Sequence, residues 1–250
     1  MPKIDLYQGD CLEVIKQIPS ESIDCIICDL PYGTTACKWD TVIPFDKLWE
    51  QYNRIIKDNG AIVLFGQEPF SSHLRLSNLK NYRYDYIWKK ERPTNPLNCT
   101  KQPPRYTENI SVFYKKQPTY NPQKTKRPEE NKRNNKAAKY VDETKNINTD
   151  KYNDRVLSGM NDTIYTSNVL SFSMERGLHP TQKPVALCEH LIKTYTNEGD
   201  LVLDNCMGSG TTGVACKELN RNFIGIELDE NYFKIAKERI ENTVVLKRLF

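Results

Sequence analysis

An apolar, β-branched segment at residues 23–28 ends directly at the sequence Asp29-Leu30-Pro31-Tyr32-Gly33. Such a segment is typical of a strand, so a carboxylate, a rigid proline turn and an aromatic ring come together where that strand ends. Open α/β sheets bind their ligands at the carboxyl ends of their strands. The segment therefore predicts an α/β fold with a ligand site that begins at Asp29.

Two later strands end in a similar way. Residues 201–204 form an apolar strand that ends at Asp204 and leads into a glycine-rich sequence at 208–213, followed by a helix up to 219. The next strand, 222–227, ends at Glu227. Glycines let the backbone approach a ligand closely, and an acidic residue at the end of the next strand accepts hydrogen bonds from ribose hydroxyls. These residues predict a nucleotide-like cofactor.

Residues 208–213 also match the pattern G-x-G-x-x-G, so a nicotinamide dinucleotide is an alternative ligand. A dehydrogenase usually carries this unit near its N-terminus and its substrate residues after it. Here only residues 228–250 follow the third strand. That position disfavours a nicotinamide cofactor.

The rest of the chain predicts one α/β domain with an insertion, and 250 residues are enough to bury a core. Further strands are expected at 3–7, 61–65, 84–88 and 110–114. Helices are expected after Asp10, around 48–56 with a stop at Asn59-Gly60, and at 68–78, 184–196 and 230–240.

Between residues 117 and 176 the periodicity disappears, and Pro, Asn, Lys, Asp and Thr dominate. Twelve Lys and Arg stand against six Asp and Glu between 115 and 155, although the formal net charge of the chain is only +4. The positive charge is therefore local. We expect 1–116 and 177–250 to be two halves of one domain and 117–176 to be an inserted recognition region; a disordered polar linker is the alternative.

The eight cysteines are expected to be free thiols. Cys25, Cys28, Cys206 and Cys216 lie in apolar strand or helix patterns, as buried cysteines do in reducing compartments. Cys25 and Cys28 form C-x-x-C, but no second pair has zinc spacing, so we expect no metal site. We also expect no membrane insertion and no secretion, hence a cytoplasmic protein, because long apolar and signal-like segments are missing.

Five pieces of the chain resemble, in the same order, the amino-methylating DNA methyltransferases in which a D-P-P-Y motif precedes the glycine-rich loop. They are Gly9-Asp10, Asp29-Leu30-Pro31-Tyr32, the sequence His-Pro-Thr-Gln-Lys-Pro at 179–184, the loop at Gly208, and Phe223-Ile224-Gly225-Ile226-Glu227. The resemblance covers most of the chain. It implies a Rossmann-like fold that uses S-adenosylmethionine, with a mostly parallel, twisted sheet and helices on both faces.

The resemblance also implies which residues bind the cofactor. Glu227 would bind the ribose, and Asp10 with the Cys11 backbone would contact the adenine edge. The methionine end would lie near Asp29, His179, Lys183 and Asp204, and near the loop residues Gly208, Ser209, Gly210, Thr211 and Thr212. Two of these have structural alternatives: Asp10 as a cap of the following helix, and His179 as the start of a turn. The chain has Asp204-Asn205-Cys206 where the family commonly has Asp-Pro-Phe, which makes the packing at the sulfonium uncertain.

The motif at Asp29 suits methylation of an exocyclic amine, whose lone pair is delocalised into the base ring. The Asp29 carboxylate and the Leu30 carbonyl would accept the two N–H groups and aim the lone pair at the methyl group. Leu30 replaces the usual proline, but it would act through its carbonyl. Pro31 sets the turn, and Tyr32 would stack on a base extruded from the duplex; a core tyrosine is the alternative.

Asp at the first motif position favours adenine N6 in double-stranded DNA over cytosine N4, as a tendency of the family. Methylation of a protein glutamine is a less favoured alternative, because in the enzymes that do this the cofactor loop precedes the motif. A cytosine-C5 mechanism is excluded because no cysteine follows a proline. A catalytically inactive DNA-binding protein is disfavoured, and a homodimer and a restriction endonuclease partner are two further hypotheses.

Overall fold

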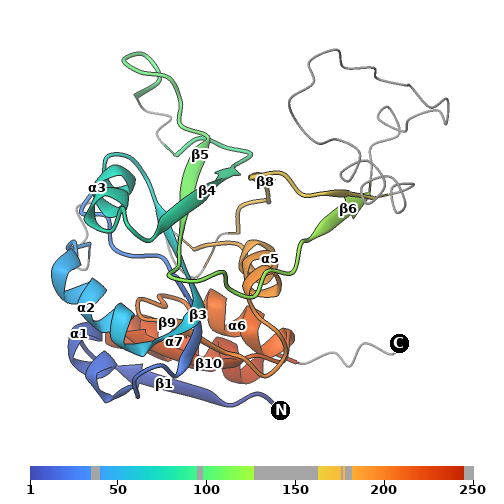
Figure 1. Ribbon diagram of the computed structural model, residues 1–250. Coiled ribbons are helices and arrows are strands. Elements are labelled where there is room, and N and C mark those ends of the chain that lie inside the picture. Colours follow the sequence, from blue (N-terminus) through green and yellow to red (C-terminus); the bar gives the residue numbers. More distant parts are fainter. Residues whose placement is uncertain (35–39, 95–97, 127–162, 176, 178–181, 245–250) are drawn as a thin grey trace, which may run out of the picture. The chain divides into compact units, whose positions relative to one another are not determined.

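The structure is a computed structural model that describes residues 1–34, 40–94, 98–126, 163–175, 177 and 182–244 (Figure 1). The described chain divides into two compact units. The first contains residues 1–121 and 168–250, and the second contains residues 122–167. Everything said below about the sheet, its helices and the site concerns the first unit.

Eight strands form one sheet in the order β1-β10-β9-β2-β3-β5-β4-β8. Their bounds are β1 Ile4–Gln8, β2 Ile23–Cys28, β3 Ile56–Gly66, β4 Tyr82–Lys89, β5 Thr107–Phe113, β8 Val169–Ser171, β9 Leu201–Asp204 and β10 Asn222–Glu227. Every neighbouring pair is parallel except the two that contain β5. The expected mostly parallel sheet is confirmed.

Helices cover both faces of this sheet (Figure 1). One core lies under α5, α6 and α7, and the other lies under α1, the 3-10 turn η1, α2 and α3. The bounds are α1 Cys11–Val14, η1 Ile15–Gln17, α2 Phe45–Ile55, α3 Phe70–Ser77, α5 Val185–Tyr195, α6 Thr211–Glu218 and α7 Glu230–Asn242. The order of elements therefore gives the predicted three-layer α/β fold.

The boundary between α2 and β3 differs from the prediction, which placed the end of the helix at Asn59-Gly60. The helix ends at Ile55 because Glu21 and Ser22 donate hydrogen bonds to the carbonyls of Arg54 and Ile55. The strand then starts at Ile56, which pairs with Ile23. Gly60 sits at an irregular place in this strand, where an added Cβ would lie 2.9 Å from the Asp24 carbonyl oxygen.

The second unit contains a short antiparallel pair, β6 Lys124–Lys126 and β7 Thr163–Tyr165. The Lys124 ammonium lies 5.1 Å from the centre of the Tyr165 ring. This unit contains residues 122–167 and is shorter than the predicted inserted region, 117–176. The prediction that all of 117–176 lies outside the sheet is wrong for β8, because that strand pairs with β4.

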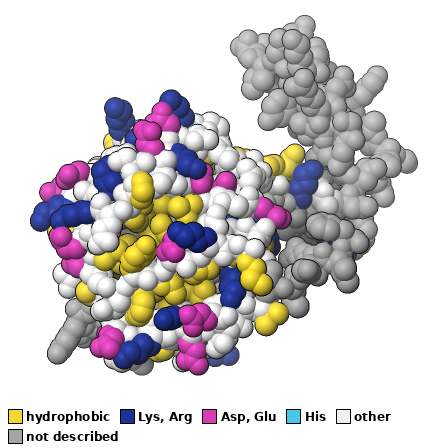
Figure 2. Space-filling model, turned by 90° about the horizontal axis from the view of Figure 1, so that it is seen from below, with side chains coloured by type: hydrophobic (Ala, Val, Ile, Leu, Met, Phe, Trp, Pro, Cys, Tyr) yellow, Lys and Arg dark blue, Asp and Glu magenta, His cyan; other side chains and the backbone are white. Residues whose placement is uncertain are grey.

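The described cysteines are all free thiols. None of the described helices has the length and apolar character needed to cross a membrane. Figure 2 shows one face of the molecule, on which apolar side chains reach the surface between basic and acidic ones. Basic and acidic side chains are mixed on that face, so it carries no patch of a single charge.

Candidate active site

A cavity of about 330 Å³ opens at the carboxyl ends of the parallel strands. It lies at the switch point of the sheet between β9 and β2. From there the chain runs outward from β2 to β3 on one side and from β9 to β10 on the other. Ligands of open α/β sheets bind at such a point. The predicted site residues that line the cavity are Asp10, Cys11, Asp29, Leu30, Pro31, Tyr32, Lys183, Asp204, Gly208, Ser209, Thr211, Thr212 and Glu227.

One predicted residue, Gly210, does not line the cavity. Gly210 is the N-cap of α6 and faces away from the ligand side, because a Cβ there would meet Ala236 and Ile240 at 3.0 Å. Its backbone φ of +78° lies in the left-handed region that glycine adopts without strain. His179 lies outside the described residues.

Asp29 lines the cavity and receives two hydrogen bonds. The Tyr32 hydroxyl donates to Oδ1 over 2.6 Å, and the Lys183 ammonium donates to Oδ2 over 2.5 Å. Burial raises the pKa of Tyr32, and the Asp29 charge adds to this effect, so the hydroxyl keeps its proton. The Tyr32 ring lies 5.0 Å from the ring of Phe70, while the Leu30 side chain is buried in the core.

The chain after the motif is held by Asp40. Its carboxylate accepts hydrogen bonds from the backbone N–H groups of Gly33 and Thr34, over 2.8 and 2.9 Å. Asp40, Val42, Ile43 and Pro44 line the same cavity. This side of the cavity is therefore mostly apolar and adjoins the Asp29 carboxylate.

Glu227 lines the cavity from the carboxyl end of β10. Its two carboxylate oxygens accept hydrogen bonds from the backbone N–H groups of Gly208, over 2.8 Å, and Asp229, over 2.9 Å. Burial raises the pKa of Glu227. From α7, Arg239 donates to the Ser209 carbonyl over 3.2 Å and to the Thr211 hydroxyl over 2.9 Å, and so supports the glycine loop from outside the cavity.

Asp10 and Glu227 are neighbours because β1 pairs with β10 in the register Gln8 to Glu227. The Gly9 N–H donates to the Glu227 carbonyl over 2.9 Å. Asp10 accepts from the Leu12 N–H over 2.8 Å, so it does cap the following helix. Both acidic residues line the cavity, as the motif order predicted.

Asp204 is 4% exposed and lies between the Asp29 motif and the glycine loop. Burial raises its pKa to about 7. The Thr212 hydroxyl donates to one carboxylate oxygen over 2.7 Å, and the Cys206 N–H donates to the other over 3.1 Å. Asp204 therefore holds the start of the glycine loop and α6 together.

The departure at Asn205 has a structural explanation. The Tyr52 hydroxyl of α2 donates to the Asn205 side-chain oxygen over 2.5 Å, and both residues are buried. The Asn205 amide in turn donates to the Cys206 sulfur over 3.5 Å. Asn205 therefore fits where the family commonly has proline, because Tyr52 of α2 supplies a hydrogen-bond donor.

Two charged residues near the cavity were not predicted from the sequence. Lys90 and Glu108 are buried, form an ion pair with each other, and adjoin Lys183. Both lie next to strand ends at the ligand edge, since Trp88 pairs with Glu108 across β4 and β5. The only signal in the sequence was the position of charged residues directly beside apolar strands.

The cavity fits an adenosyl cofactor. Its volume lies in the range of small-molecule sites, and it is lined by the acidic residue Glu227 and by the glycine loop at Gly208. Gln182 also lines it, and within the described part of the chain its buried Oε1 atom accepts no hydrogen bond. Fold and site together define a Rossmann-like methyltransferase that uses S-adenosylmethionine.

Comparison with known proteins identifies the family. The family model described as DNA methylase, of the N6/N4 methyltransferase type, matches residues 23–238. The chain belongs to this family of DNA methylases, and its activity is the transfer of a methyl group from S-adenosylmethionine to DNA.

Individual relatives agree with this assignment. The type II methyltransferase M.HpaI of Haemophilus parainfluenzae is 32% identical over 95% of this chain and 74% of its own length. The type II methyltransferase M2.DpnII of Streptococcus pneumoniae is 28% identical over 96% of this chain and 90% of its own length.

Solved structures agree as well. The crystal structure of the M1.HpyAVI-SAM complex has a TM-score of 0.64 and 29% identity, covering 95% of this chain and 98% of the other. The cytosine-N4-specific PvuII DNA methyltransferase has a TM-score of 0.69, covering 98% of this chain and 89% of the other. At 17% identity, the PvuII enzyme is informative for the fold alone.

Proposed function

We propose that this DNA methyltransferase modifies the exocyclic N6 amine of an adenine in double-stranded DNA. The observation that carries the proposal is the Asp29 carboxylate, which lines the cavity and accepts two hydrogen bonds from polar donors. An amine presents the same kind of donor. A carboxylate also stabilises the positive charge that develops on nitrogen during methyl transfer.

The remaining catalytic roles follow from this one. The Leu30 carbonyl is proposed as the second acceptor, so that the two N–H groups of the amine are held and its lone pair faces the methyl group. Tyr32 is proposed to face the extruded base, since its ring lines the cavity beside Val42, Ile43 and Pro44. Stacking on Tyr32 would offset part of the cost of unstacking the base, which is a few kcal/mol.

S-adenosylmethionine, when bound, supplies a methyl group activated by a sulfonium. Glu227 would hold the ribose, and Asp10 with the Cys11 backbone would contact the adenine edge. The glycine loop at Gly208 would lie along the cofactor, and the unpaired oxygen of Gln182 is a candidate acceptor for its ammonium group. Asp204 holds the start of the loop in place, and Lys183 contacts Asp29 when no target base is bound.

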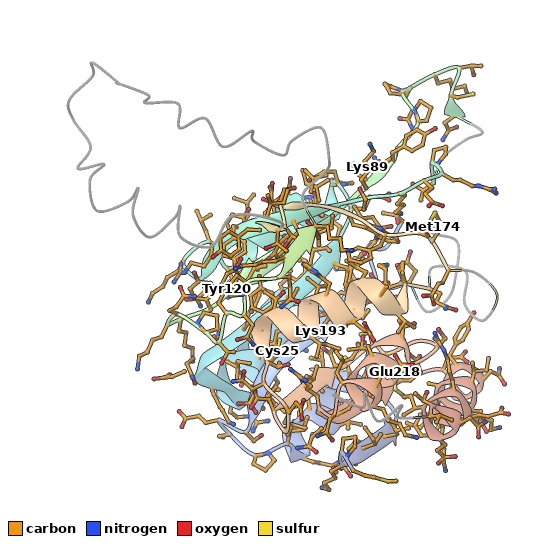
Figure 3. The ribbon with its side chains drawn as sticks, turned by 90° about the vertical axis from the view of Figure 1, so that its right-hand side faces the viewer. Cys25, Lys89, Tyr120, Met174, Lys193 and Glu218 are labelled. Atoms are coloured by element: carbon orange, nitrogen blue, oxygen red, sulfur yellow. The ribbon has the colours of Figure 1, made fainter. Side chains whose placement is uncertain are left out.

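DNA is proposed to lie along the carboxyl edge of the sheet. The loop between β4 and β5 extends from this edge, with Lys89 at its base (Figure 3). In its described residues it carries further cations at Arg92, Lys101 and Arg105, against one acidic residue, Glu91. Cations that neutralise phosphates give affinity without sequence specificity.

The inserted region 117–176 remains the proposed source of base specificity, and most of it lies outside the described residues. If it is a recognition region, deleting residues 124–151 should weaken DNA binding and reduce its salt dependence. Unchanged affinity and unchanged salt slope would make it a passive linker.

The choice of adenine is tested by its product. Unmethylated DNA treated with the protein and S-adenosylmethionine should give N6-methyladenine in nucleoside mass spectrometry. N4-methylcytosine as the main product would overturn the choice of base and leave the amine mechanism in place.

The role of Asp29 is tested by substitution. Asp29→Ala should abolish transfer of labelled methyl groups to DNA, and Asp29→Asn should leave only a trace, because the charge on the carboxylate is lost. The circular dichroism spectrum should stay unchanged in both variants. Wild-type transfer rates in the Ala variant would refute the assignment.

Two proposals concern partners and location. A restriction endonuclease of the same sequence specificity and a homodimer are proposed as partners; co-purification and sedimentation test them. Because the substrate is DNA, we expect the protein to act in the cytoplasm.

A further inference from the structure

Four charged side chains form a continuous chain beside the cavity; three of them are buried, and the Asp29 side chain is 23% exposed. Asp29 follows β2, Lys183 precedes α5, Glu108 lies in β5, and Lys90 follows β4. Lys183 contacts Asp29 over 2.5 Å and Glu108 over 3.4 Å, and Glu108 forms a second ion pair with Lys90. Lys90, Glu108 and Lys183 are 3, 8 and 7% exposed. Two cations and two carboxylates therefore balance each other, and only the Asp29 carboxylate is partly exposed to water.

The two oxygens of Glu108 differ in their contacts. Oε1 accepts a hydrogen bond from Lys90. Oε2 is buried and, among the described residues, accepts none, although the Lys183 nitrogen lies 3.4 Å away. An ammonium group has three donors, and Lys183 uses one of them on Asp29. Glu108 thus offers Lys183 a second acceptor that its present position does not satisfy.

The arrangement matters because each Asp29 oxygen already accepts one hydrogen bond, Oδ1 from the Tyr32 hydroxyl and Oδ2 from the Lys183 ammonium. Each oxygen has a second lone pair, so a target amine can bind Asp29 beside these donors, but it competes with the Lys183 charge for the carboxylate. If Lys183 moved from Asp29 without a new partner, its charge would be buried and unpaired, which is strongly unfavourable. Burial lowers the pKa of Lys183, but the carboxylates of Asp29 and Glu108 outweigh this and raise it, so Lys183 stays charged.

We propose that Glu108 is a positioning residue that receives the Lys183 ammonium when the target amine binds Asp29, and that Lys90 holds Glu108 in place for this exchange. The inference rests on the proposed role of Asp29 and goes beyond it. Glu108 touches neither the base nor the cofactor in this scheme. It acts through Lys183 on the availability of Asp29.

The exchange predicts opposite effects for the two partners of Glu108. Glu108→Gln removes the charge that attracts Lys183, so Lys183 stays on Asp29 and competes with the amine. Lys90→Met leaves Glu108 with Lys183 as its single cation, which draws Lys183 away from Asp29. A purely structural role would make both substitutions harmful, because each breaks the same buried pair.

The experiment measures single-turnover methyl transfer to unmethylated mixed-sequence DNA, with S-adenosylmethionine affinity measured separately by calorimetry. Coupling energies between contacting residues correspond to about tenfold changes, so Glu108→Gln should lower the transfer rate by about tenfold or more and Lys90→Met should raise it about twofold. The affinity for S-adenosylmethionine should stay within about threefold. The matched control is Asp24→Asn, which alters a paired carboxylate of β2, bound to Lys57 over 2.6 Å at the opposite edge of the sheet.

Glu108→Gln leaves Lys90 unpaired and can therefore fail to fold. A third variant covers this case. The double variant Glu108→Gln with Lys90→Met keeps the buried charges balanced and should transfer as slowly as Glu108→Gln. Wild-type rates in a folded double variant, or slower transfer in Lys90→Met to the same extent as in Glu108→Gln, would overturn the inference.

Asp29→Ala measured in the same series separates the two proposals. If Asp29→Ala abolishes transfer and the Glu108 variants behave like wild type, only the inference fails. If Asp29→Ala transfers normally, or wild-type protein does not methylate DNA, the proposed function fails and the inference falls with it.

Discussion

The buried carboxyl of Asp204 should make the stability of the protein depend on pH. Its pKa is raised by burial from 3.8 to about 7. The folded protein therefore holds this proton at pH values where the unfolded chain has lost it. The free energy of unfolding should fall as pH rises from about 4 to about 7, and the loss should be complete above pH 7.

The size of this effect follows from the two pKa values. Each unit of difference corresponds to 1.36 kcal/mol, so the full gap is worth about 4 kcal/mol, of which about 2 to 3 kcal/mol falls between pH 5 and pH 8. Asp204→Asn removes the titration. Its side-chain oxygen can still accept from Thr212, which now donates to Asp204 over 2.7 Å.

Urea unfolding at pH 5 and pH 8, without cofactor, measures the effect. The drop in unfolding free energy between the two pH values should be smaller in Asp204→Asn than in the wild type by about 2 to 3 kcal/mol. Other groups with shifted pKa values, such as Glu227 and His190, are common to both proteins and cancel in the comparison. Parallel pH profiles in the two proteins would refute the reasoning.

Two further substitutions test the cavity and the loop. Gly210→Ala should destabilise the fold by about 1 to 3 kcal/mol and weaken S-adenosylmethionine binding, because its φ of +78° is strained for alanine. Thermal unfolding measures the stability and calorimetry measures the binding. Unchanged stability and affinity would contradict the role of this turn. The double variant Arg92→Ala with Lys101→Ala should reduce the slope of log affinity for DNA against log salt by about 2. The control is Lys116→Ala, which should leave this slope unchanged, because the Lys116 ammonium pairs with Asp58 over 2.6 Å. Equal slopes for all three proteins would remove the loop from the DNA surface.

The elements beside the cavity were predictable because their sequences are locally consistent. Strands β2, β9 and β10 begin and end at the expected residues, since each is an apolar run closed by a polar or glycine-rich turn. The end of α2 was predicted wrongly because tertiary hydrogen bonds decide it. The carbonyls of Arg54 and Ile55 bond to Glu21 and Ser22, and no pattern within α2 contains this information.

The residues of the site were also predictable only in part. Residues at the ends of the strands, such as Asp29 and Glu227, were predictable because motif and topology coincide there. Lys90 and Glu108 were missed because their pairing depends on the register of β4 against β5. Such a register arises between segments that are brought together only by folding. The contact of Lys183 with Asp29, 154 positions apart in the sequence, depends likewise on the finished sheet.

The pairing of β1 with β10 also fixes when the site can appear during synthesis. The Lys3 N–H bonds to the Asn222 side chain, 219 positions later in the chain, and Gly9 bonds to Glu227. Asp10 therefore leaves the ribosome long before Glu227, which lines the same cavity. Contacts of such separation form slowly. A nascent chain that already displays the Asp29 motif cannot yet hold its methyl donor, so the enzyme gains cofactor binding and activity together only after Glu227 has been synthesised.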